Sequence, residues 1–296
     1  MSYVERGLVF DCAGESLVGV VAVPERPEKT GVVIIVGGPQ YRIGSHRQFV
    51  LLARHFAANG FACLRFDNRS MGDATGETRD FEDIDEDLAA AVTALVTAVP
   101  DVTRIVLLGL CGGASAACVY APRDPRVKAL FLLNPWVRTA ESHAKAYIKH
   151  YYVDRLRDPA FWKKLLAGKV SVVGAVSGFV RTARRAAFGG AKAPEKPEVS
   201  GAASTLMEQM LDGLELSGCR SVVVLSGRDY VARECDEVLI PHPRFQRLAA
   251  ASQANVVRVN DADHTFTSPE LHQLLEQLAA DFVRSVHVEE MDGSRP

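Results

Sequence analysis

The chain has 296 residues, of which 48% are hydrophobic and 24% charged, and its formal net charge at pH 7 is -2. This composition is typical of a folded globular protein and excludes a disordered chain, and the small net charge argues against a nucleic-acid-binding role. No stretch reaches the roughly 18 apolar residues of a membrane-spanning helix, and charged residues interrupt the N-terminal segment where a signal peptide would be apolar. We therefore expect a cytoplasmic protein.

The spacing of the cysteines argues against disulfide bonds and against a metal site. The six cysteines show no paired C-x-x-C spacing, so the sequence predicts neither a disulfide framework nor a metal site, and it implies no organic cofactor. Free cysteine is among the most buried residue types, so most of these thiols are expected in the core.

Short β-branched segments alternate with helix-length amphipathic segments, which is typical of a mostly parallel sheet flanked by helices. In chain order we expect a hairpin over 7–13 and 16–23, a strand over 31–38, a helix over 45–59, a strand over 61–67, a helix over 80–99, a strand over 104–110, a further helix and a strand over 127–134. After Trp136 the alternation stops, and it resumes with a strand over 220–227, a helix over 243–252, a strand over 255–261 and a helix over 268–286.

The interruption indicates an inserted segment. Residues 137–215 lack convincing strand patterns and contain helix-like pieces such as AESHAKAYIKHYYVDRL. We expect an α/β core formed by residues 1–136 and 216–296, and a helical lid or cap formed by residues 137–215. The lid is rich in Lys and Arg, which makes it a candidate for attracting an anionic substrate or for a weak contact with a membrane surface; a solvated lid face explains the charges as well.

Gly109-Leu110-Cys111-Gly112-Gly113 follows the strand over 104–110 and precedes small, helix-forming residues. This arrangement resembles the nucleophile elbow of α/β-hydrolases, in which a tight Gly-x-nucleophile-x-Gly turn presents the nucleophile at the carboxyl edge of the sheet. The resemblance implies an α/β-hydrolase fold with Cys111 as the nucleophile. From this motif alone, a buried thiol that only packs in the core is the alternative.

In this fold the acid follows a late strand and the histidine follows the last one. Asp229 lies just beyond a strand in VVVLSGRDY, and His264 follows the next strand in VVRVNDADHTF. We therefore predict His264 as the catalytic base and Asp229 as its acid. Asp236, Asp261 and Asp263 are alternative acids.

The third requirement is an oxyanion hole, to which the backbone N–H after the nucleophile, that of Gly112, contributes. IIVGGPQ resembles the His-Gly-Gly-Pro-Gly turn of proline iminopeptidase-like hydrolases, with Val36 and Gln40 replacing the first and last residues. That resemblance implies Gly38 as the second donor, because Pro39 has no N–H. A structural Gly-Pro turn is the alternative.

Residues near these loops in the sequence are candidates for substrate binding, namely Gln40, His46, Arg47 and Trp136. A helix N-cap formed by Ser45 explains the segment around His46 as well.

The chain as a whole resembles the exosortase A system-associated hydrolases, α/β-hydrolase relatives encoded beside bacterial exopolysaccharide and protein-sorting genes. The resemblance covers nearly the full length and rests on GGPQYRIGSHRQFVLLAR, GLCGGASAA, LLNPWVRT and HYYVDRL…FWKKLLAG. In that family the residue after the nucleophile is often acidic, so Gly112 is a departure. The family implies a hydrolase whose substrate is undefined.

Together these features predict a cysteine-nucleophile hydrolase that acts on the carboxylic ester or thioester of a small-molecule acyl substrate through an acyl-cysteine intermediate. Two alternatives remain open at this stage. One is an acyltransferase that moves the acyl group to a sugar hydroxyl or an amine, and the other is a catalytically dead scaffold of the same fold.

Overall fold

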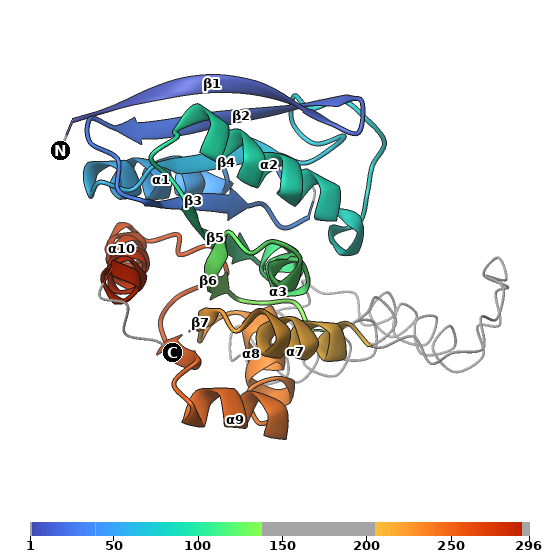
Figure 1. The fold of residues 1–296 in the computed structure, drawn as a ribbon. Helices are drawn as coiled ribbons and strands as arrows, with labels where there is room; N and C mark the ends of the chain where they lie inside the picture. Colours follow the sequence, from blue (N-terminus) through green and yellow to red (C-terminus); the bar gives the residue numbers. More distant parts are fainter. Residues whose placement is uncertain (1, 39, 138–204, 292–296) are drawn as a thin grey trace, which may run out of the picture. The chain divides into compact units, whose positions relative to one another are not determined.

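The computed structural model describes residues 2–38, 40–137 and 205–291 of the chain, and the centre of this part is an eight-stranded sheet (Figure 1). The strands lie in the order β1-β2-β4-β3-β5-β6-β7-β8. Their bounds are β1 Tyr3–Cys12, β2 Glu15–Pro24, β3 Thr30–Ile35, β4 Cys63–Asp67, β5 Arg104–Leu110, β6 Val127–Leu133, β7 Arg220–Ser226 and β8 Ala254–Val259.

The sheet is mostly parallel. β2 pairs antiparallel with both β1 and β4, and every other neighbouring pair is parallel. Parallel neighbours need long crossover connections, which the helices between the strands provide. The mostly parallel sheet flanked by helices, expected from the sequence, is confirmed.

Helices cover both faces of the sheet (Figure 1), and the buried apolar residues form a separate core on each face. One face packs against α1 (Gln48–Ala58) and α10 (Pro269–Met291). In the described part of the chain, the helices that pack against the other face are α2 (Asp85–Ala98), α3 (Gly112–Tyr120), α7 (Leu206–Ser217), α8 (Tyr230–Val238) and α9 (Pro243–Ala250).

The strand residues show why both faces are covered. In β3, Val33 and Ile35 belong to the core under α2 and α3, whereas Val32 and Ile34 belong to the core under α1 and α10. Side chains alternate between the two faces of a strand, so a strand that is buried on both sides is an unbroken apolar run. These runs are the segments from which the sequence predicted the parallel strands.

Two predicted helix starts differ from the structure. The chain forms a short 3-10 turn over Ser45–Arg47 before α1, and another over Phe81–Asp83 before α2. Ser45 makes no side-chain capping hydrogen bond, so the interpretation of Ser45 as an N-cap is wrong. His46 and Arg47 instead adopt positive φ angles of 42° and 66°, which turn the backbone before α1 begins.

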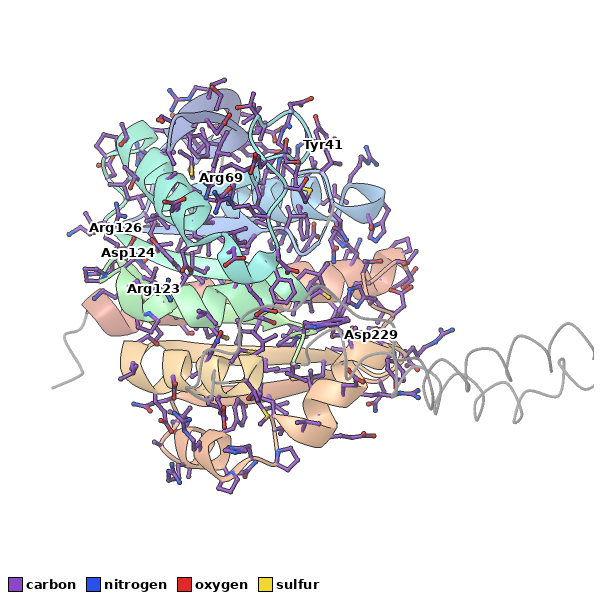
Figure 2. The ribbon with its side chains drawn as sticks, turned by 90° about the vertical axis from the view of Figure 1, so that its right-hand side faces the viewer. Tyr41, Arg69, Arg123, Asp124, Arg126 and Asp229 are labelled. Atoms are coloured by element: carbon purple, nitrogen blue, oxygen red, sulfur yellow. The ribbon has the colours of Figure 1, made fainter. Side chains whose placement is uncertain are left out.

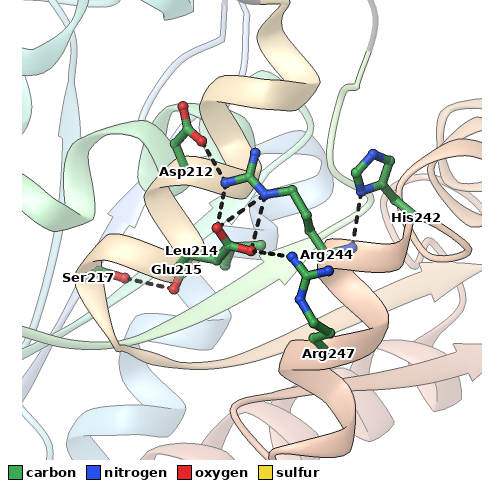
Figure 3. A network of polar contacts seen from close by, with 7 residues as sticks. All are labelled: Asp212, Leu214, Glu215, Ser217, His242, Arg244 and Arg247. Carbon is green, nitrogen blue, oxygen red and sulfur yellow. Dashed lines mark hydrogen bonds and ion pairs between the residues drawn. The ribbon is translucent and has the colours of Figure 1, made fainter.

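The chain divides into two compact units, one formed by Met1–Val137 with Leu206–Pro296 and the other by Arg138–Thr205. Residues 206–215, which the sequence analysis placed in the lid, therefore belong to α7 of the first unit. Ion pairs tie α7 to α9: Arg244 lies 2.6 Å from Asp212 and 2.5 Å from Glu215 (Figure 3). The basic surface predicted for the lid lies outside the described residues.

The described residues also show how apolar the helices are and where the cysteines lie. None of their helices combines the length and the apolarity needed to cross a membrane. Five of the six cysteines are buried, as expected for core residues, and Cys111 alone is partly exposed.

Candidate active site

Cys111 lies between β5 and α3, at the carboxyl edge of the sheet. Its φ and ψ angles are 56° and -122°, a sparsely populated conformation for a residue with a side chain, which costs roughly 1–3 kcal/mol. The surrounding backbone holds it there: the Cys111 N–H donates to the carbonyl of Leu133 at 2.9 Å, and the Cys111 carbonyl accepts from Ala114 N–H at 3.0 Å. The structure thus has the strand-turn-helix geometry of a nucleophile elbow.

The three glycines around Cys111 have no room for a side chain. A Cβ at Gly109 would overlap the main chain of Gly113, and a Cβ at Gly113 would lie 2.6 Å from the carbonyl oxygen of Ile35. A Cβ at Gly112 would lie 2.8 Å from the ring of Phe81. The small residues therefore allow α3 to begin directly against β3 and β5.

The loop after β3 lies against the first turn of α3. A Cβ at Gly37 would lie 3.0 Å from the amide nitrogens of both Gly112 and Gly113. Gly38 follows with a φ of 69°, and its carbonyl accepts the N–H of Gln40 at 2.8 Å. Since first-turn amides lack partners within their helix and lie at its positive end, this is an environment that stabilises an oxyanion.

His264 lies in the loop between β8 and α10, and its ring contacts Asp229. Its Nδ1 is 2.8 Å from Oδ2 of Asp229. Asp229 is 8% exposed and forms the N-cap of α8, where the same oxygen accepts the N–H of Ala232 at 3.0 Å. The carboxylate is thus fixed by a helix terminus while it orients the imidazole. Figure 2 labels Asp229.

Two of the three alternative acids have other partners, and the third faces solvent. Asp236 pairs with Arg258 at 2.5 Å, and Asp261 is exposed. Asp263 accepts the backbone N–H of Thr267 at 2.9 Å, within its own loop. Of the four candidate acids, Asp229 is the one whose side chain hydrogen-bonds to His264 in the described part of the chain.

The environment of His264 favours its protonated form. Burial lowers the pKa of the imidazole, but its hydrogen bonds with Asp229 and Cys111 outweigh that effect and raise the pKa to about 10. Because Nδ1 faces Asp229, Nε2 is the nitrogen available to the Cys111 sulfur. At neutral pH the ring is therefore an imidazolium that can stabilise a thiolate.

A family model described as "Alpha/beta hydrolase family" matches residues 32–280, which include all of these loops. The chain belongs to the alpha/beta hydrolase family. No curated protein sequence matches it.

Solved structures resemble this alpha/beta hydrolase at low sequence identity. An esterase from Pyrococcus furiosus has a TM-score of 0.65 and 15% identity, over 96% of this chain and 92% of the esterase. Est1E from Butyrivibrio proteoclasticus, solved with ferulic acid, has a TM-score of 0.60 and 16% identity, over 94% of this chain and 98% of Est1E. A dienelactone hydrolase from Anabaena variabilis has a TM-score of 0.59 and 14% identity, over 94% of this chain and 96% of that protein. At these identities the likeness shows the shared fold.

The four candidate substrate-binding residues of this alpha/beta hydrolase occupy different places. Trp136 donates its backbone N–H to the carbonyl of Cys111 at 3.4 Å, so it lies beside the elbow. His46 binds the carbonyl of Thr265 through Nε2 at 3.0 Å and thereby contacts the His264 loop. Arg47 is exposed, whereas Gln40 follows the Gly38 loop, and its buried Oε1 has no hydrogen-bond partner among the residues that the structure describes.

The structure also brings two residues to the site that the sequence analysis missed. Phe81 packs against Gly112, and Asn134 donates a hydrogen bond to the carbonyl of His264 at 3.0 Å. Phe81 lies between charged residues in RDFEDI before α2, and Asn134 directly follows the apolar strand β6, and neither position by itself predicts a contact with Gly112 or His264. In the described part of the chain, no cluster of three or more His, Cys, Asp or Glu side chains is arranged to hold a metal ion.

Proposed function

We propose that this alpha/beta hydrolase cleaves carboxylic esters or thioesters through an acyl-cysteine intermediate on Cys111. The single observation that carries the proposal is the contact network of His264, which hydrogen-bonds to Asp229 and interacts with a thiol at a strained elbow. A scaffold that has lost catalysis has no need for this combination.

In the first half of the reaction, the Cys111 thiolate attacks the acyl carbon and forms a C–S bond. The carbonyl electrons move to the oxygen, and the N–H groups of Gly112 and Gly38 are the proposed donors to that oxyanion. When the tetrahedral intermediate collapses, the bond to the leaving group breaks, and His264 gives its Nε2 proton to the departing alkoxide or thiolate.

In the second half, neutral His264 takes a proton from water, and the resulting hydroxide attacks the acyl-cysteine. The C–S bond breaks, the carboxylic acid leaves, and the thiolate-imidazolium pair is restored. Asp229 accepts the Nδ1 hydrogen bond throughout, which keeps Nε2 directed toward the sulfur.

The sulfur nucleophile favours activated acyl donors. Acylation of a thiolate produces a thioester, so thioesters, activated esters and lactones are better substrates than amides. The names of the structural neighbours, an esterase and a dienelactone hydrolase, agree with an ester or lactone substrate. We further propose that the chain is one of the exosortase A system-associated hydrolases, on the sequence motifs given above.

Intact-protein mass spectrometry after incubation with short aryl esters and acyl-CoAs tests the proposal. We expect an acyl adduct on Cys111 that disappears in water as free acid is formed. The adduct should be absent in Cys111→Ala and strongly reduced in His264→Ala. His242→Ala is the matched control, because His242 caps α9 and belongs to a polar network that does not include Cys111, Asp229 or His264 (Figure 3).

The outcomes separate the candidate functions. An adduct that is released only when a sugar or an amine is added identifies an acyltransferase. If no donor acylates Cys111 and iodoacetamide labels Cys111 equally in the wild type and in His264→Ala, the protein is a scaffold and the proposal is wrong.

A further inference from the structure

Asn134 occupies a fully buried position directly after β6, and its backbone is constrained before its side chain is considered. Its φ is 47°, in the left-handed region that asparagine tolerates better than most residues. Its backbone N–H donates to the carbonyl of Val224 in β7 at 2.9 Å. The residue is therefore fixed to the neighbouring strand.

The side-chain amide of Asn134 uses its acceptor and both of its donors. Oδ1 accepts the backbone N–H of Ser226 at 2.9 Å. Nδ2 donates to the Ser226 hydroxyl at 2.9 Å and to the carbonyl of His264 at 3.0 Å. The amide thus has a complete set of partners in a place where an unsatisfied polar group would be costly.

These partners belong to the two segments that carry the acid and the base of the proposed triad. Ser226 is the last residue of β7, and its carbonyl accepts the N–H of Asp229 at 3.2 Å. The other partner is the main chain of His264 itself. One amide therefore connects the turn before Asp229 with the backbone of His264.

We infer that Asn134 is a positioning residue that sets the place of the His264 imidazole between Asp229 and Cys111. The inference rests on the proposed function of Cys111 and His264. If the hydrogen bond to the His264 carbonyl is lost, the loop can shift while Asp229 and Cys111 stay on their own elements. Displacement of a catalytic group by about 1 Å costs on the order of a hundredfold in rate.

Three variants separate this role from simple support of the fold. Asn134→Gly tolerates the positive φ and removes all three side-chain hydrogen bonds. Asn134→Asp keeps an acceptor for the Ser226 N–H but places a carboxylate oxygen against the His264 carbonyl. Ser226→Ala is the matched control, because it removes the hydroxyl partner of Asn134 and leaves the hydrogen bond to His264 in place.

The variants are compared by ester turnover and by the ¹H NMR resonance of the His264 Nδ1 proton. We expect kcat of Asn134→Gly and Asn134→Asp to fall by about tenfold to a hundredfold with little change in KM, and the Nδ1 resonance to shift or broaden. Ser226→Ala should stay within about threefold of the wild type. If Asn134→Gly does not fold, Asn134→Asp carries the test.

Two outcomes overturn the inference. One is a folded Asn134 variant with a wild-type Nδ1 resonance and a wild-type kcat, and the other is a Ser226→Ala variant that is as impaired as the Asn134 variants. If the proposed function itself is wrong, the experiment gives a different result. In that case wild-type Cys111 is not acylated, while the Nδ1 resonance still reports whether Asn134 positions His264.

Discussion

Nδ1 of His264 and Oδ2 of Asp229 are 2.8 Å apart, and that carboxylate oxygen also accepts the N–H of Ala232 in the first turn of α8. The acid of the proposed triad is therefore fixed at a helix N-terminus, where a negative charge is favoured. The imidazole, in turn, is held by a carboxylate that has little freedom to turn away.

Asp229→Asn tests the role of the carboxylate. An amide keeps the shape of the side chain but removes the negative charge that favours the imidazolium, so the pKa of His264 should fall clearly below about 10. We expect kcat to fall by about 10²–10⁴-fold, since the imidazole loses its orienting partner. An NMR titration of the His264 ring checks the pKa. Asp236→Asn, which disturbs only the exposed pair with Arg258, should leave both quantities unchanged.

The raised pKa of His264 also makes stability depend on pH. The folded protein keeps the His264 proton up to about pH 10, whereas an unfolded histidine loses it near its ordinary pKa of 6.5. The stabilisation by protonated His264 is therefore complete below about pH 6.5 and is lost as the pH rises toward 10. Urea unfolding should show that the stability difference between the wild type and His264→Gln shrinks across this range. A difference that stays constant with pH would contradict the protonation state proposed here.

Because Gly112 packs against Phe81, activity that is lost when position 112 gains a side chain should be partly restored by shortening Phe81. Gly112→Ala places a methyl group 2.8 Å from the Phe81 ring, so the ring or the first turn of α3 must move. We expect Gly112→Ala to lose at least about tenfold in kcat/KM, and Phe81→Ala to restore part of that loss in the double variant. Gly37→Ala is the matched comparison, because its Cβ meets the backbone of Leu110 and not a side chain. Phe81→Ala should not rescue Gly37→Ala; equal rescue of both would show that Phe81 acts in another way.

The sequence predicted some elements residue by residue and missed others for physical reasons. β5 spans Arg104–Leu110 as expected, because a strand buried on both faces is an unbroken apolar run. α8 was missed because its nine residues include four charged ones, and its burial rests on Ala232, Glu234 and Cys235. The 3-10 turn before α1 depends on positive φ angles at His46 and Arg47, for which these residue types give no signal.

Some residues of the candidate site could likewise be predicted from the sequence, and others could not. Cys111, Asp229 and His264 could be found because the order of strands brings the ends of β5, β7 and β8 to one edge of the sheet. Asn134 could not, because its partners Ser226 and His264 lie 92 and 130 residues away in the sequence. Topology predicts which segments meet, whereas the hydrogen bonds that fix a segment depend on the folded backbone.

The buried ion pair between Arg69 and Asp87 predicts a large effect on stability. Arg69 donates to Asp87 from its backbone N–H, Nε and Nη2 at 2.7, 2.9 and 2.7 Å, and Asp87 is fully buried (Figure 2 labels Arg69). Asp87→Ala leaves the buried guanidinium without this partner, so we expect urea unfolding to show a loss of about 3–5 kcal/mol. Glu86→Ala is the control, because Glu86 pairs with the same guanidinium at 2.8 Å but its side chain is 61% exposed. Its loss should stay below about 1 kcal/mol, and similar losses in the two variants would show that burial does not set the strength of these pairs.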